Sequence, residues 1–520
     1  MARKMPLKAA AVHVVATKRV FPSTSVCVFI AAVTIATGAM AGTGVASSSP
    51  TTGIASTGLS PAVTGPVCSI TEHGAVGDNS TLCTLAIQTA IDTCSARHPE
   101  GSTVLVPRGS FRTGSIELRS NMRFHLAEGA GLYGSTDPRD YTVSRQWFGG
   151  HLQFNFNALI RGANLTNVSV TGSNAFIGRS PRGAAGTSIV DGVGWKWWCQ
   201  AGCIPLMRDG LSRLWCDVMN PENSSLPTAL LPEPRGQGRP RLIDFYNCSG
   251  VFLQGFTAQN SPHWTIHLQY SRDLVVQNMT VLSPRSVGNT DGIDPDSCVN
   301  TLISDSFVEV GDDGISVKSD NITNDAGESV MMPTRNLTMR RLLIRSRNWC
   351  IGSSTFGGIY DVLLEDSEIG SPDDPTSPVP WAIKFKSHEF FPGSIVNVTV
   401  RRIKIGSVGP TPWMYPRNSG GAFALGLTYS GTPPSRHGTP YVQNVTFEDI
   451  SVVSAGTPGS IEGLPESCFE QLAFKNVTFG KITVAPKWEC KNVQKHSFVH
   501  EGVVPPFDGC TNNNSVGTCA

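Results

Sequence analysis

Residues 396–406 read VNVTVRRIKIG, and the same pattern returns at 442–454 as VQNVTFEDISVVS and at 474–485 as FKNVTFGKITVA. Each stretch combines an Asn and a Thr or Ser with residues that alternate between apolar and polar. Alternation with a period of two is typical of a β-strand with one buried face. Further copies of this loose repeat lie upstream, at 164–172, 248–260, 272–283, 298–310, 335–346 and 359–370.

The spacing of the repeat favours a solenoid over a β-sandwich. Most successive copies start roughly 20 to 40 residues apart, which is the scale of one solenoid coil with loops of variable length. No two copies are joined directly by a two-residue Asn-Gly or Asp-Gly hairpin turn, as antiparallel neighbours often are. We therefore predict parallel stacking in a β-helix. In such a coil an Asn can adopt the left-handed conformation at the turn and bond to the Asn of the next coil.

The N-terminal region has a different composition. Basic residues precede an apolar run from Val26 to Thr37, and small residues follow around Ala41. This order predicts a secretory signal at 1–41, although an uncleaved anchor is the alternative. A Ser/Thr/Gly-rich leader is expected at 42–66, the β-helix domain at 67–490 and a tail at 491–520. One amphipathic helix is expected near the start of the domain, at 84–95.

Bulk properties agree with a secreted, turn-rich β protein. The 520 residues include 53 Gly and 35 Pro, only 16% are charged, and the net charge of +1 offers no overall field for nucleic acid or an anionic membrane. Of the 14 cysteines, 13 remain without the signal, enough for several disulfides and one unpaired thiol in an extracellular protein. Twelve N-x-S/T sequons fit a glycoprotein. Seven of them fall inside the repeat, where Asn has the backbone role described above.

Two acidic clusters carry the strongest chemical signal. They read NTDGIDPDS at 289–297 and GDDGISVKSD at 311–320, so Asp291 and Asp312 lie 21 residues apart, about one coil. Residues one coil apart stack at roughly 4.8 Å, which should bring Asp291, Asp312 and Asp313 together. Crowded carboxylates raise one another's pKa, and a protonated carboxyl beside a carboxylate is what glycoside hydrolysis needs. Polar turns and a calcium site are the alternative interpretations of the same residues.

Two lysines and several tryptophans add candidates for substrate binding. Lys384 and Lys386 alternate with apolar residues in WAIKFKSH, so both should project from one strand face. Beside the aspartates they would bind the carboxylate of an acidic sugar, but on an exposed strand they would serve only solubility. Trp264 is expected in the core. The cluster GWKWWC at 194–199 is equally compatible with core packing and sugar stacking, and residues 199–237 are expected to form a long loop tied by disulfides.

The order of the motifs resembles a known family. ITEHGAVGDNSTLCTLAIQTAIDTC, VLVPRGSFRTGSIELRSNMRFHLAEGAGLYGS, SPHWTIH, NTDGIDPDS, GDDGISVKS and IGSSTFGG follow one another as in glycoside hydrolase family 28, above all its exo-polygalacturonase-like branch. The likeness covers about 67–485. It implies an all-β, right-handed parallel β-helix with a short N-terminal capping helix. It also implies inverting hydrolysis of α-1,4-galacturonosidic bonds of pectin without a metal or other cofactor.

The resemblance assigns a role to each site residue. Asp312 would be the general acid, while Asp291 and Asp313 would hold and activate the water. Asn289 would help to position the substrate, and Lys384 with Lys386 would match the family's Arg-x-Lys pair that grips the galacturonate carboxylate. The expected protein is a secreted, extracellular monomer that acts on pectic polysaccharide, with no nucleic-acid partner and no stable membrane association. A pectin lyase on the same fold is an alternative that relies on a basic group to abstract a proton, often with calcium, and the sequence does not supply that arrangement beside the acidic cluster.

Two positions depart from the family pattern. The family has a His-Gly six or seven residues before the Ser of IGS, whereas this chain has Ser346 or Arg347 there. Lys384 replaces an Arg and loses its planar, bidentate fork. Strict galacturonate preference should therefore be weaker. The alternative substrates are rhamnogalacturonan and a substituted galacturonan, and the alternative function is pectin binding with little catalysis.

Overall fold

The computed structural model separates residues 1–51 from a second unit, Thr52–Ala520, which holds every residue that it describes. It describes residues 65–148, 151–173, 187–200, 238–323, 329–411, 421–429, 438–494, 497–507 and 510. The predicted signal, nearly all of the predicted leader and nearly all of the predicted loop at 199–237 lie outside this part. Among the described residues, no helix is both long and apolar enough to cross a membrane.

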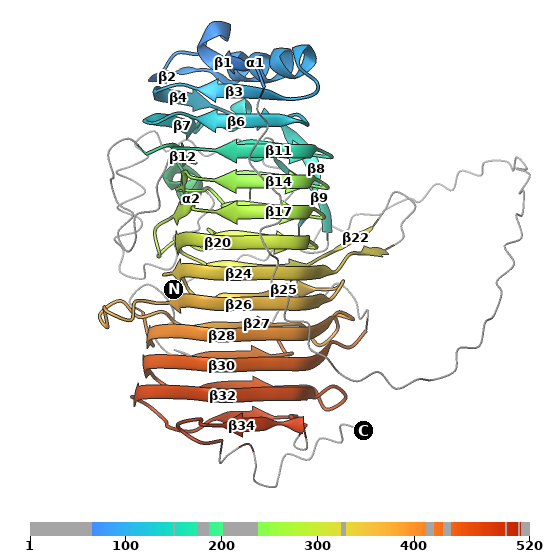
Figure 1. Cartoon of the computed structure of the whole chain (residues 1–520), viewed down its shortest axis with the longest axis vertical. Helices are drawn as coiled ribbons and strands as arrows, with labels where there is room; N and C mark the ends of the chain where they lie inside the picture. The colour runs from blue at the N-terminus through green and yellow to red at the C-terminus, as the bar shows by residue number, and fades with distance from the viewer. Residues whose placement is uncertain are drawn as a thin grey trace, which may run out of the picture. The chain divides into compact units, whose positions relative to one another are not determined.

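The second unit is a stack of coils whose strands pair in parallel with the next coil (Figure 1). One sheet contains the shorter strands: β5 (Ile116–Glu117), β10 (Ile160–Ala163), β13 (Ile243–Tyr246), β16 (Ile266–Gln269), β19 (Ile293–Asp296), β21 (Ile315–Ser319), β25 (Trp349–Thr355), β27 (Ile383–Lys386), β29 (Phe423–Gly426), β31 (Gly459–Glu462) and β33 (Glu489–Lys491). Each pairs with its neighbours in this order. The predicted parallel β-helix is confirmed, and the sandwich is excluded.

The repeats recognised in the sequence form the second, longer sheet. Its strands are β1 (Val67–Ser69), β2 (Asp78–Leu82), β3 (Ser102–Val106), β4 (Gly109–Thr113), β6 (Met122–Leu126), β7 (Ala130–Gly134), β11 (Thr166–Thr171), β12 (Ile189–Asp191), β14 (Ser249–Gln254), β15 (Thr257–Gln259), β17 (Arg272–Gln277), β18 (Thr280–Leu282), β20 (Val299–Glu309), β24 (Thr334–Ile344), β26 (Ile359–Ile369), β28 (Ser394–Val408), β30 (Tyr441–Ala455), β32 (Phe469–Ile482) and β34 (Val499–Glu501). Two antiparallel hairpins, β8 (Val143–Phe148) with β9 (His151–Phe156) and β22 (Asn321–Thr323) with β23 (Ser329–Met331), interrupt the coils.

Asparagines at the coil turns form the predicted ladder. Asn300, Asn336, Asn397 and Asn444 all have φ between 55° and 59°. The side-chain amide of Asn336 donates to Asn300 Oδ1 at 2.9 Å, and that of Asn444 donates to Asn397 Oδ1 at 2.8 Å. Asn tolerates the left-handed backbone conformation, and each side-chain hydrogen bond satisfies the side-chain carbonyl of the Asn in the neighbouring coil. The repeated N-x-T therefore has a structural cause.

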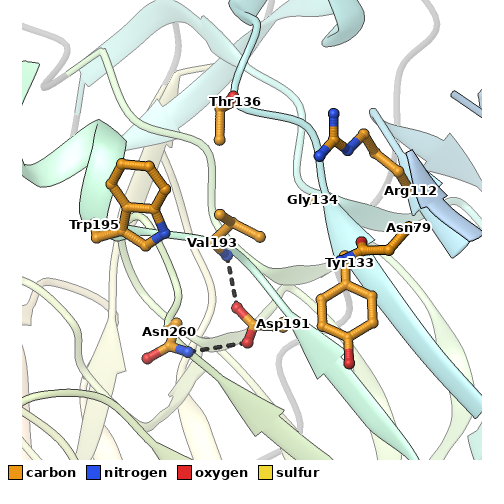
Figure 2. Close-up of a pocket in the computed structure, with 9 residues that line it drawn as sticks. All are labelled: Asn79, Arg112, Tyr133, Gly134, Thr136, Asp191, Val193, Trp195 and Asn260. Carbon is orange, nitrogen blue, oxygen red and sulfur yellow. Dashed lines mark hydrogen bonds between the residues drawn. The ribbon is translucent and has the colours of Figure 1, made fainter. Parts of the chain in front are cut away.

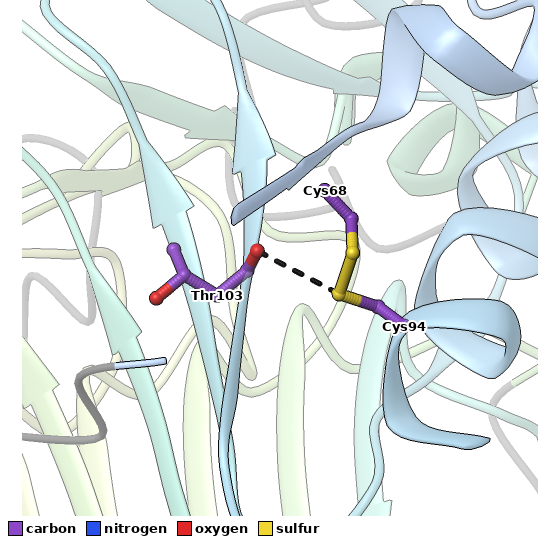
Figure 3. Close-up of a disulfide and its surroundings, with 3 residues drawn as sticks. All are labelled: Cys68, Cys94 and Thr103. Atoms are coloured by element: carbon purple, nitrogen blue, oxygen red, sulfur yellow. Dashed lines mark hydrogen bonds between the residues drawn. A yellow bond between two sulfur atoms is a disulfide. The ribbon is translucent and has the colours of Figure 1, made fainter. Parts of the chain in front are cut away.

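The N-terminal end of the stack is covered by helix α1 (Thr84–Arg97), where the sequence predicted a helix at 84–95. Its buried face consists of Ile87, Ala90, Ile91 and Cys94. Figure 3 shows the disulfide between Cys68 of β1 and Cys94 of α1, whose Sγ lies 3.9 Å from the Thr103 carbonyl of β3. The cap is thus tied covalently to the first coil. Two short 3₁₀ helices occur at Ile70–His73 and Pro138–Asp140, and α2 spans Trp195–Gln200.

The cysteines differ from the prediction of one unpaired thiol. Besides Cys68–Cys94, a disulfide joins Cys490 to Cys510, but Cys83, Cys248, Cys298 and Cys350 are buried thiols. Cys248 and Cys298 occupy equivalent positions two coils apart, so they cannot form a disulfide. Ser271 occupies the coil between them, where its Oγ accepts from the Cys248 N–H. Two coil steps of about 4.8 Å exceed the Cα separation that a disulfide allows.

The C-terminal end continues the stack beyond the predicted domain limit at 490. Strand β34 pairs with β32, Val504 bridges to Thr478, and Phe507 is buried against Trp488 with ring centroids 4.2 Å apart. The first part of the predicted 491–520 tail therefore closes the last coil.

Candidate active site

The three predicted aspartates meet at one corner of the stack. Asp291 lies in the connection from β18 to β19, and Asp312 and Asp313 lie in the next one, from β20 to β21. Because Ile293 pairs with Ile315, the register sets Asp291 opposite Asp313, and the Gly292 N–H donates to the Asp313 carbonyl at 2.9 Å. One carboxyl oxygen from each aspartate lies within 4.8 Å of the others. Coil spacing thus predicted the grouping correctly.

Asp291 is the carboxyl most disposed to hold a proton. It is 5% exposed, and its Oδ1 is buried without a hydrogen-bond partner among the described residues. Burial raises the pKa of Asp291 well above its usual range, and the charges of Asp294 and Asp312 raise it further. The nearest cation, Lys318 Nζ, lies 3.6 Å from its Oδ2 but is bonded to Asp294. The site therefore keeps a proton above the pH at which an isolated aspartate loses it.

Asp313 has the opposite electrostatic environment. Burial raises its pKa, but the Lys386 ammonium, which bonds to its Oδ2, outweighs burial, and the net pKa lies below the usual value. The Cys350 thiol donates to the same oxygen at 3.3 Å. Asp313 is thus favoured as a carboxylate, whereas the pKa of the neighbouring Asp291 is raised.

Asp312 is the most accessible of the three carboxyls. Its side chain is 13% exposed, against 7% for Asp291 and 6% for Asp313. The Arg347 guanidinium donates to its Oδ1 at 2.8 Å, and the Asn289 N–H donates to its Oδ2 at 2.7 Å. Asp312 therefore stands at the open side of the site with both oxygens engaged by donors.

Asn289 supports this arrangement through its backbone. Its φ of 59° turns the N–H towards Asp312, while its side-chain Oδ1 accepts from Arg239 Nη2 at 3.2 Å. Gly288, just before it, has space because a Cβ there would meet only Arg347 and Asp312 atoms at 3.7 Å or more.

The two predicted lysines lie beside the aspartates, as their functional interpretation required. Strand β27 stands two strands beyond β21, and Lys384 and Lys386 point to the same side of it. Lys386 contacts Asp313, whereas Lys384 Nζ lies 4.1 Å from the centroid of the Trp381 ring and 5.7 Å from that of Tyr429. Burial, followed by the charge of Lys386, lowers the pKa of Lys384. Within the described residues, Lys384 has no carboxylate within ion-pair distance and can accept an anionic ligand.

Of the two residues at the place where the family pattern has a histidine, Arg347 contacts the trio and Ser346 does not. Ser346 is fully buried, and its hydroxyl accepts from the Val310 N–H at 3.0 Å and donates to the Val308 carbonyl at 3.3 Å. It fastens two coils together. Arg347, one residue later, carries the only guanidinium in contact with Asp312 among the described residues.

Trp264 is not a core residue, which corrects the expectation from sequence. It is only half-buried, its ring lies under Lys318 Nζ at 4.1 Å and Arg241 Cζ at 5.0 Å, and the next residue, Thr265, donates to the Asp291 carbonyl at 2.8 Å. The turn before β16 points its side chain outward, one coil from Asp291. Of the GWKWWC cluster, Trp197 and Trp198 are buried, whereas Trp195 lines a pocket.

A network of buried charges beside the trio was missed in the sequence. Arg241 Nη1 and His267 Nδ1 contact Asp244 Oδ1 at 2.9 and 2.7 Å, and Lys318 contacts Asp294. Asp244, His267 and Asp294 occupy one row across β13, β16 and β19. The sequence signal that could have revealed this network is a titratable residue at the second position of three consecutive apolar strands. This row fixes Lys318 and Trp264 beneath the site.

The same cations oppose the calcium alternative. Each carboxylate of the trio already faces a positive group: Lys318 beside Asp291, Arg347 on Asp312 and Lys386 on Asp313. A divalent cation favours a site where several carboxylates lack such partners. The arrangement fits proton transfer better than cation binding.

Comparisons with known proteins find relatives in sequence and in fold. The family model described as Glycosyl hydrolases family 28 matches residues 232–328, which contain all three aspartates. A probable polygalacturonase from Vitis vinifera is 29% identical over 84% of this chain and 79% of its own length, and an exo-poly-alpha-D-galacturonosidase from Dickeya chrysanthemi is 25% identical over 80% and 72%. The structure of an exopolygalacturonase from Thermotoga maritima has the same fold, with a TM-score of 0.61 and 22% identity over 84% of this chain and 92% of that one.

Proposed function

Because this chain belongs to glycoside hydrolase family 28, we propose that it hydrolyses the α-1,4-galacturonosidic bonds of pectin from the chain ends. The observation that carries the proposal is the contrast between Asp291, whose pKa is raised, and Asp313, whose pKa is lowered, within one group of carboxyls. Glycoside hydrolysis requires a carboxyl that carries a proton and a carboxylate within reach of the same bond, and opposite pKa shifts among neighbouring carboxyls allow one group to hold both states.

In the proposed mechanism Asp312 delivers the proton to the glycosidic oxygen. It is the most exposed carboxyl of the trio, and its side chain lies beside that of Asp291. Asp313, kept ionised by Lys386, takes a proton from the attacking water, which Asp291 helps to hold. Trp264 supports one face of the sugar beside the bond that breaks.

Recognition of the acidic sugar falls to the cations on β27. Lys384 faces the site without an ion-pair partner among the described residues, so it is the group available to the galacturonate carboxylate, while Lys386 serves mainly Asp313. A single ammonium is a less directional ligand for a carboxylate than a guanidinium. A substituted galacturonan is therefore the second candidate substrate, favoured by Lys384 and by Arg347 at the histidine position.

Inversion at the anomeric carbon is part of the proposal. The nearest oxygens of the trio lie within 4.8 Å, closer than the roughly 6.5–9.5 Å separation common in inverting enzymes. Inversion then requires the water to bind at the open edge of the trio. Proton NMR of fresh product tests this: inversion releases the β-anomer first, and initial release of the α-anomer would refute it.

We also propose that the protein is secreted as a monomer and acts on the cell wall outside the cell. Residues 1–41 carry the signal-like pattern, and the disulfides Cys68–Cys94 and Cys490–Cys510 suit an oxidising compartment. N-terminal sequencing of the protein recovered from culture medium should begin near residue 42.

The activity itself is tested by product analysis on polygalacturonate, rhamnogalacturonan and xylogalacturonan. New reducing ends without ultraviolet absorbance, appearing as monomer on the preferred polymer, support exo-hydrolysis. Absorbance from unsaturated uronide would indicate elimination, a mixture of longer oligomers would indicate endo-action, and no product with retained binding would indicate a pectin-binding protein.

A further inference from the structure

A separate pocket of about 400 Å³ opens on the N-terminal half of the stack (Figure 2). Its lining residues come from β2, β4, β7, β12, the start of α2 and the turns that follow β7, β12 and β15. The volume lies in the range of sites that hold small molecules or single sugar residues. None of the groups assigned to catalysis contributes to it.

The pocket lies on the same corner of the coils as the catalytic trio. Gly192 donates to the Gln259 carbonyl at 2.9 Å, Asn260 to Leu282 at 2.8 Å, and Ser283 to Glu309 at 2.8 Å. This row of bonds runs from the floor of the pocket to the connections that carry Asp291 and Asp312. Three coil steps of 4.8 Å place the two sites about 14 Å apart along the stack. A polymer lying along this corner would contact both.

Aromatic rings form opposite walls of the pocket. Figure 2 shows Trp195 on one side and Tyr133 with Arg112 on the other. Both rings are half-buried, in contrast to Trp197 and Trp198, which fill the core. The Tyr133 ring lies over Gly131, where a Cβ would come within 2.5 Å of it, so the missing side chain lets the ring lie in this position. Half-exposed aromatic faces are the surfaces on which sugars stack.

Polar groups between the walls distinguish this pocket from an apolar one. Asp191 is buried, and its carboxylate accepts from the Val193 N–H at 2.7 Å, Gln259 Nε2 at 2.7 Å and Asn260 Nδ2 at 3.0 Å. These bonds satisfy Asp191. Arg112 is exposed, and among the described residues no carboxylate lies within ion-pair distance of it. It is therefore a guanidinium available to a ligand's carboxylate, with Asn79 beside it for hydroxyl groups.

We propose that this pocket is a distal subsite that binds one uronate residue of the acidic polysaccharide, with Arg112 on its carboxylate and Trp195 against its ring. The inference rests on the proposed function, because it takes the polymer substrate from there. The protein would then contact the polysaccharide several coils away from the bond that is cleaved. Long chains should therefore bind more tightly than short ones.

The test compares Arg112→Gln with the wild type on two substrates, polygalacturonate and digalacturonate. Arg272→Gln is the matched control, because Arg272 is an exposed arginine of β17 whose side chain is 70% accessible and takes no part in the pocket. We expect Arg112→Gln to raise KM for the polymer about ten-fold, as loss of one charged hydrogen bond would. Its kcat, its kinetics on digalacturonate and the behaviour of Arg272→Gln should stay unchanged.

Calorimetric titration with hexagalacturonate separates this inference from the proposed function. One possible outcome is that the wild type binds the hexamer, that Arg112→Gln weakens this binding, and that no protein tested hydrolyses any galacturonan. In that case the distal subsite is supported and the proposed function is refuted. If hydrolysis is normal but Arg112→Gln behaves like Arg272→Gln, the subsite is refuted. A wild type that neither binds nor hydrolyses overturns both. Trp195→Leu provides a second variant should Arg112→Gln lose its wild-type circular dichroism, and it should also weaken hexamer binding.

Discussion

Arg347 donates from Nη1 to Asp312 Oδ1 across 2.8 Å, so a guanidinium holds the most exposed carboxyl of the site. Glycoside hydrolase family 28 has a histidine at this place in the sequence. Here the position after the coil-fastening Ser346 carries a permanent positive charge instead. Because Arg cannot accept a proton, it can orient Asp312 but cannot relay protons.

Replacing this arginine by histidine should bring the site closer to the family pattern that the motifs resemble. We expect Arg347→His to raise kcat on polygalacturonate by roughly three- to ten-fold, about 1 kcal/mol in the barrier, because an oxygen of Asp312 is released for the substrate. Steady-state kinetics measure this, with Arg341→His, which removes an exposed pair with Asp305, as control. Unchanged or lower turnover would mean that Arg347 is adapted to another substrate. The same change at Ser346 should instead destabilise the fold, because that side chain is fully buried.

Removing the proton donor should stop the reaction without disturbing the fold. Asp312→Asn keeps the shape of the side chain, so we expect kcat to fall by at least about 10³-fold with an unchanged circular dichroism spectrum and Tm. Asp305→Asn, an exposed carboxylate on β20, should retain full activity. Wild-type rates in Asp312→Asn would refute the assignment of the site.

The ionised form of Asp291 should destabilise the folded protein. Because burial raises its pKa in the folded state, its ionisation opposes folding as pH rises through that pKa, whereas below the unfolded pKa of about 3.9 the carboxyl is neutral in both states. Asp291→Asn should therefore melt above the wild type at pH 8 and equal it near pH 3.5, while losing most activity. Thermal denaturation across this range is the measurement. A lower Tm at pH 8 would show that the charged carboxylate is stabilising.

The Lys386–Asp313 pair should show the opposite pH dependence. The lowered pKa of Asp313 contributes stability above its unfolded pKa of about 3.9, and the raised pKa of Lys386 contributes below about 10.4. Lys386→Met should thus lower the free energy of unfolding by about 3–5 kcal/mol near neutral pH, since it leaves a buried carboxylate alone. The deficit should shrink as Asp313 becomes protonated below pH 4. Lys404→Met, an exposed lysine of β28, is the control; an equal loss in both variants would contradict a special role for the pair.

Local pattern was sufficient for much of the fold. Alternation with period two predicted the repeated strands because a half-buried strand must place alternate side chains in the core, and the Asn ladder followed from the tolerance of Asn for left-handed backbone. Coil length likewise brought Asp291 to Asp313, since residues one coil apart must stack. These features depend on spacing along the chain, and the sequence by itself determined them.

Other features depend on which coils become neighbours and on the direction of each turn. Only the tertiary structure decided that Arg347 rather than Ser346 faces Asp312, that Trp264 points out of the core, and that Lys386 neutralises Asp313 from 73 residues away. Loops of variable length separate the coils, so the partner of a side chain cannot be counted along the chain. The sequence supplied the three carboxyls, and the stacking of distant coils decided which of them lies buried without a bonded cation, which pairs with Lys386 and which is the most exposed.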